Sequence, residues 1–145
     1  MRIGNWYLLE LVLEHIIKNP ADYNQTSWSC GSQRCIAGWI ADMAGYQFIS
    51  SGTVVPNYVK LTIEDDGDIS NDVWDLSAEV ETVALKMLEI DPETDTDDVA
   101  NMLFLGTLSW PEVLTGVYVL AQADERFLSE TIMDEMRRVG VVAEV

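Results

Sequence analysis

Apolar side chains recur every three or four residues near the start of the chain, which is the spacing of one face of an α-helix. Over residues 5–18 they form a wide stripe, and Glu10, Glu14 and Lys18 form the one polar stripe at intervals of four. Asn19-Pro20 should end this helix, because a residue before proline disfavours helical backbone angles. The pattern predicts a largely buried first helix.

A second helix is predicted over residues 32–44, between a serine that can cap its first turn and a glycine that can end it. Its apolar positions include Cys35, Trp39 and Met43, which are spaced four residues apart and therefore share one face. We expect Trp39 to be buried on this face.

Helical spacing is lost after the second helix, and short β-branched or alternating stretches take its place. Thr53–Val55 and Tyr58–Ile63 are typical of strands, Ile69–Val73 is a weaker candidate, and Asp65-Asp66-Gly67 is typical of a turn. We predict a small β-hairpin around residues 53–73 and no large sheet.

Helical spacing then returns and continues almost to the end of the chain. The predicted helices are residues 77–90, a short helix capped by Thr94 or Thr96 that runs through Leu105, and residues 109–123 and 124–139. The clearest boundary is Ser109-Trp110-Pro111-Glu112, a capping box with proline in the first turn. In the last helix we expect Phe127 and Leu128 to face inward.

These segments together predict a mainly α, α+β fold: a compact bundle of about five to six helices with the small β-hairpin. The chain has 145 residues, the length of one domain, so we expect residues 1–145 to form a single globular domain. No apolar run approaches the ~20 residues that a membrane-spanning helix needs. The apolar start of the chain contains two glutamates and does not resemble a signal peptide, so a cytoplasmic location is expected.

The net charge of −17 changes this picture because it is concentrated in one segment. Residues 1–63 carry four acidic and four basic side chains, and residues 99–145 carry seven acidic and three basic ones. Residues 64–98 carry 14 acidic side chains and one lysine, a net charge of −13. A field of this size repels nucleic acid and anionic membranes and attracts a cation or a basic protein surface. The alternative is a surface that only keeps the protein in solution.

We predict that two loops of this segment form a partner-binding acidic surface, with the helix at residues 77–90 between them. Its members are Asp65, Asp66, Asp68, Asp91, Glu93, Asp95, Asp97 and Asp98. Glu79, Glu81 and Glu89 are expected on the solvated side of that helix, whose ends would lie roughly 20 Å apart. Neither loop has the glycine at position six and the glutamate at position twelve that an EF-hand requires.

Both cysteines lie in the stretch Cys30-Gly-Ser-Gln-Arg-Cys35, for which four interpretations stay open. With His15 and an aspartate such as Asp22 or Asp42 they could bind zinc, although a fourth cysteine or histidine ligand is lacking. Cys30 could be an activated thiol, but the single histidine lies upstream of it. A Cys30–Cys35 disulfide is geometrically possible. A small buried core residue is the simplest interpretation of Cys35.

The residues around the cysteines resemble a pattern found in small uncharacterised proteins of actinobacteria and their phages. The pattern comprises Gln25, Trp28, Cys30-Gly31-Ser32, Cys35, Ala37-Gly38-Trp39 and Gly45. A looser similarity extends to Ala84–Leu88 and Leu103-Phe104. Asn19 stands where that family often has histidine, which weakens the case for a histidine-dependent site. The resemblance implies a bacterial or phage origin and no known activity.

We therefore expect a small acidic interaction protein without enzymatic activity, of phage or actinobacterial origin, that engages a host protein in the bacterial cytoplasm. In its sharper form, the hypothesis is that the protein mimics nucleic acid at a basic surface of that host protein. No cofactor, no direct nucleic-acid contact and no membrane contact are expected. The alternative is a metal-binding or thiol-reactive site that uses Cys30, Cys35 and His15.

Overall fold

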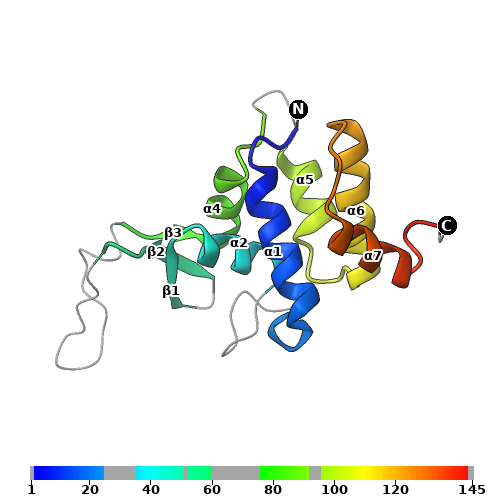
Figure 1. The fold of residues 1–145 in the computed structure, drawn as a ribbon. Helices are drawn as coiled ribbons and strands as arrows, with labels where there is room; N and C mark the ends of the chain where they lie inside the picture. The colour runs from blue at the N-terminus through cyan, green and yellow to red at the C-terminus, as the bar shows by residue number, and fades with distance from the viewer. Residues whose placement is uncertain (1, 25–34, 51, 60–75, 92–95, 144–145) are drawn as a thin grey trace.

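The computed structural model describes residues 2–24, 35–50, 52–59, 76–91 and 96–143 of the chain. Within these ranges six α-helices surround a common core, and a three-stranded antiparallel sheet lies beside one end of the bundle (Figure 1). The helices are α1 Trp6–Lys18, α2 Ile36–Met43, α4 Val80–Met87, α5 Thr96–Leu103, α6 Trp110–Ala123 and α7 Glu130–Arg138. This arrangement confirms the predicted mainly α, α+β class.

Helix α1 begins where the sequence predicts, because the Asn5 side chain accepts a hydrogen bond from the Leu8 amide at 3.2 Å. It ends at Lys18, and the short 3-10 turn η1 (Pro20–Asp22) follows. Its apolar stripe, including Trp6, is buried against the rest of the bundle. The predicted first helix is therefore confirmed.

Helix α2 starts later than predicted. Cys35 is its N-cap, with an extended backbone, so the helix begins at Ile36 and the predicted start at Ser32 is wrong. Ser32 itself lies outside the described residues. The Cys35 Sγ accepts a hydrogen bond from the Gly38 amide at 3.4 Å, in the place of the usual capping oxygen. Trp39 is buried, with only 8% of its surface exposed, as the spacing predicts.

The sheet has the order β1-β2-β3, formed by Tyr46–Ser50, Thr53–Pro56 and Ala78–Glu79. The strand at Thr53 is confirmed, but its hairpin partner is β1, which the sequence pattern did not predict. Tyr58 and Val59 lie in a turn and bend, so the predicted second strand does not begin there; its continuation lies outside the described residues.

A small hydrophobic cluster holds the sheet against the helices. Val54 of β2 packs with Ala41 of α2 and with Val80 and Val83 of α4, all of them buried. The predicted helix over residues 77–90 is thus shorter: its first residues pair as β3, and α4 spans only Val80–Met87. Backbone pairing explains the change, because Ala78 and Glu79 lie opposite Val54 and Thr53 of β2 and extend the sheet instead of the helix.

In the carboxyl-terminal half of the chain, the predicted start of one helix is confirmed and the predicted start of another is wrong. The capping box of α6 is confirmed: the Glu112 amide donates to Ser109 Oγ at 3.3 Å, and the Ser109 amide donates to Glu112 Oε1 at 3.1 Å. The last helix does not start near residue 124. It starts at Glu130, because Ser129 caps it, and Phe127 stands in the connecting segment with 94% of its surface exposed rather than facing inward.

The start of the chain is held between two helix ends, in a unit we call the amino-terminal clasp, formed by residues 2–6 and Asp124. On one side, the Asn5 amide donates to the Leu88 carbonyl at 2.9 Å, and the Gly4 amide donates to the Glu89 carbonyl at 2.9 Å. A Cβ atom at Gly4 would lie 2.9 Å from that carbonyl oxygen, so glycine permits the close approach. The clasp thereby joins the end of α4 to the end of α6.

Within the described residues no helix is both long and apolar enough to cross a membrane.

Candidate functional site

Three members of the predicted acidic surface lie in described residues. Asp97 and Asp98 are exposed in the first turn of α5, where the positive end of the helix dipole favours carboxylates. Asp91 is half-buried just after α4, and its amide donates to the Arg2 carbonyl at 2.9 Å. The other predicted members lie outside the described residues: Asp65, Asp66, Asp68, Glu93 and Asp95.

The helix between the two acidic loops is less uniformly negative than expected. Glu79 and Glu89 are exposed, but Glu81 is half-buried, and Lys86 is exposed near Glu89. The helical part spans eight residues, Val80–Met87, so it separates its ends by about 12 Å and not by the ~20 Å expected for the longer helix. The helix therefore holds its carboxylates over a shorter distance than predicted.

Two glutamates lie at positions where local physics disfavours them. Glu89 and Glu125 have positive φ angles, 52° and 54°, and each directly follows the C-cap of a helix, α4 and α6 respectively. Glycine is the usual residue in this left-handed conformation, and the negative end of the helix dipole disfavours a carboxylate. Local helix stability therefore does not account for the choice of glutamate at either position.

Several carboxylates of α1 and α7 differ from those near α4, because arginines form ion pairs with them. Arg126 binds Glu10 of α1, Arg137 binds Asp134 at 2.7 Å, and Arg138 binds Glu135 at 2.5 Å. The hydrogen bond from Arg138, together with one from the Trp110 indole, keeps the pKa of Glu135 below its usual value despite partial burial. In the described part of the chain, Glu79, Glu81, Glu89 and Asp98 form no ion pair.

Cys35 has the environment of a structural residue. It is almost fully buried, and burial raises the pKa of its thiol although hydrogen bonds from nearby amides act in the opposite direction. A raised pKa keeps the sulfur protonated, which makes it a poor nucleophile and a poor metal ligand. Cys30, the other half of the proposed thiol or zinc site, lies outside the described residues.

His15 makes contacts that hold the first two helices together. Its ring lies 4.4 Å from the Trp39 ring, and its Nε2 lies 3.3 Å from Asp22 Oδ2, in a contact without hydrogen-bond geometry. Trp39 Nε1 donates to the Asp22 carbonyl at 2.9 Å. The structure thus brings His15 and Asp22 together, as the zinc interpretation requires, yet no group of three or more metal-ligating side chains forms among the described residues.

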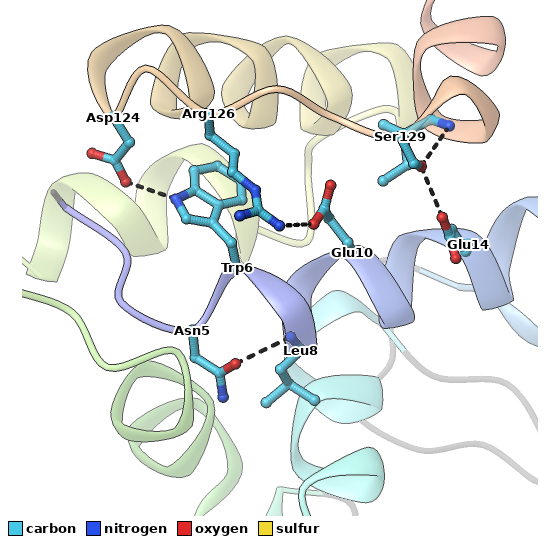
Figure 2. Close-up of polar contacts among 9 residues, drawn as sticks. Asn5, Trp6, Leu8, Glu10, Glu14, Asp124, Arg126 and Ser129 are labelled. Atoms are coloured by element: carbon cyan, nitrogen blue, oxygen red, sulfur yellow. Dashed lines mark hydrogen bonds and ion pairs between the residues drawn. The ribbon is translucent and has the colours of Figure 1, made fainter.

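Sequence reasoning missed Asp124, the one buried carboxylate among the described residues. It accepts hydrogen bonds from the Arg2 amide at 2.5 Å, from the Ile3 amide at 2.9 Å and from the Trp6 indole at 2.8 Å. Figure 2 shows the Trp6 indole nitrogen directed at this carboxylate, which lies just past the end of α6. All three donors come from the amino-terminal clasp, so Asp124 organises structure and does not belong to the acidic surface.

Comparison with known protein families, with curated proteins and with solved structures finds no match to this chain.

Proposed function

We propose that this chain is a non-enzymatic interaction protein whose acidic surface engages a basic surface of a host protein in the bacterial cytoplasm. In the sharper form of the proposal, the carboxylates imitate a run of phosphates and occupy a nucleic-acid-binding site. The similarity of the cysteine segment to small actinobacterial and phage proteins motivates a phage or actinobacterial setting. No direct nucleic-acid contact is proposed, because the net charge of −17 would repel the phosphate backbone.

The observation that supports this proposal is that some carboxylates of the fold form ion pairs with arginines and others do not. Glu10 of α1 and the three carboxylates of α7 contact the arginines of residues 126–138, whereas Glu79, Glu89 and Asp98 are exposed and form no ion pair among the described residues. Unpaired like charges raise the free energy of the folded chain, and a basic partner would relieve this repulsion.

The proposal is tested by capturing partners from an actinobacterial lysate with a quadruple variant: Asp65→Asn, Asp66→Asn, Asp97→Asn and Asp98→Asn. A matched control removes four charges elsewhere: Glu125→Gln, Glu130→Gln, Asp134→Asn and Glu144→Gln. Both variants change the net charge equally, so any difference between them reports on the position of the charges. We expect the first variant to lose the partner and the control to retain it.

Two further readouts separate a nucleic-acid mimic from a general polyanion. Capture should weaken steeply as salt rises to about 0.3 M, and added double-stranded DNA should release the captured protein. If the first variant still captures the same partners as the control at that salt concentration, the acidic residues serve solubility and the proposal is wrong. If DNA has no effect on capture, only the mimicry is lost.

A further inference from the structure

We draw no further inference here: the strongest candidate, the exposed Phe127 with the hollows beside it in the segment between α6 and α7, carries none because nothing in the described residues shows what covers this apolar surface.

Discussion

Trp39 illustrates how a single side chain connects segments that are distant along the chain. It belongs to α2, its ring contacts His15 of α1, and its Nε1 donates to the carbonyl of Asp22 in η1. Its burial follows from the spacing of apolar residues, which is why the sequence alone predicts it. The hydrogen bond does not follow from any local pattern, because its acceptor is 17 residues away.

Replacing this tryptophan by alanine should lower the free energy of unfolding by roughly 3–5 kcal/mol, the range for emptying a large core site. Trp39→Phe keeps most of the apolar contact and loses the hydrogen bond, so it should cost about 1–2 kcal/mol. Urea denaturation followed by circular dichroism measures both values. A loss below about 1 kcal/mol for the alanine variant would contradict the burial described for Trp39.

The roles of three other residues could not be predicted from the sequence. Cys35 is buried as predicted, but its role as the N-cap of α2 was missed because cysteine rarely serves as a cap. Phe127 was expected to face inward as part of a helix beginning near residue 124, yet it lies before α7 and is exposed. Asp124 resembles any surface aspartate in the sequence, since its partners Arg2 and Ile3 lie more than 120 positions away.

Among the helices and strands, the sequence predicts a boundary correctly where the residues that fix it are neighbours along the chain. Ser109 and Glu112 satisfy each other within one turn, so the start of α6 could be predicted to the residue. The start of α7 could not, because two candidate caps compete. Asp124 gives its carboxylate to the amino-terminal clasp, which leaves Ser129 to cap the helix. Pairing of β3 with β2 likewise removed the first residues from the predicted helix at 77–90.

The contact between α5 and α6 depends on Gly116. A Cβ atom there would lie 2.6 Å from the Met102 carbonyl oxygen, closer than real atoms approach, and a backbone carbonyl cannot rotate away. Gly116→Ala should therefore destabilise the protein by roughly 1–3 kcal/mol, even though alanine favours an isolated helix by about 1 kcal/mol. Thermal or urea unfolding measures the effect.

The control for this variant is Val119→Ala in the same helix, at a side chain that is 44% exposed. It should change the free energy of unfolding by no more than about 0.5 kcal/mol. If Gly116→Ala proves as stable as the unaltered chain, α5 and α6 are not as close as described.

At the scale of the whole molecule, the sequence determines how charge is divided along the chain but not which charges are neutralised. The excess in residues 64–98 is visible by counting. The pairing of Arg126 with Glu10 spans 116 positions and depends on how the segment after α6 passes over α1. The acidic excess that supports the proposed function can therefore be read from the sequence. Which carboxylates are neutralised by arginines is a property of the fold.

The amino-terminal clasp also acts on the whole molecule, because Asp124 ties the first residues of the chain to the end of α6. Burial alone would raise the pKa of Asp124, but hydrogen bonds from the Arg2 and Ile3 amides and from the Trp6 indole outweigh it and hold that pKa below its usual value. A carboxyl group whose pKa is lower when folded stabilises the protein above its unfolded pKa of about 3.9. That contribution is lost as the pH falls through the folded pKa.

Asp124→Asn should therefore lower the free energy of unfolding at pH 7 by roughly 2–4 kcal/mol, because the amide nitrogen cannot accept the hydrogen bonds that a carboxylate oxygen accepts. The difference between this variant and the unaltered chain should shrink as the pH falls below about 4, the pKa of the unfolded aspartate, and it should be smallest below the lower folded pKa, where Asp124 is protonated in the folded protein as well. Urea titrations across this range measure it, with Asp134→Asn as the control at an exposed aspartate whose loss should be nearly neutral. A difference that stays constant down to the lowest pH at which the chain folds would show that the negative charge of Asp124 contributes nothing, and that only its shape holds the clasp together.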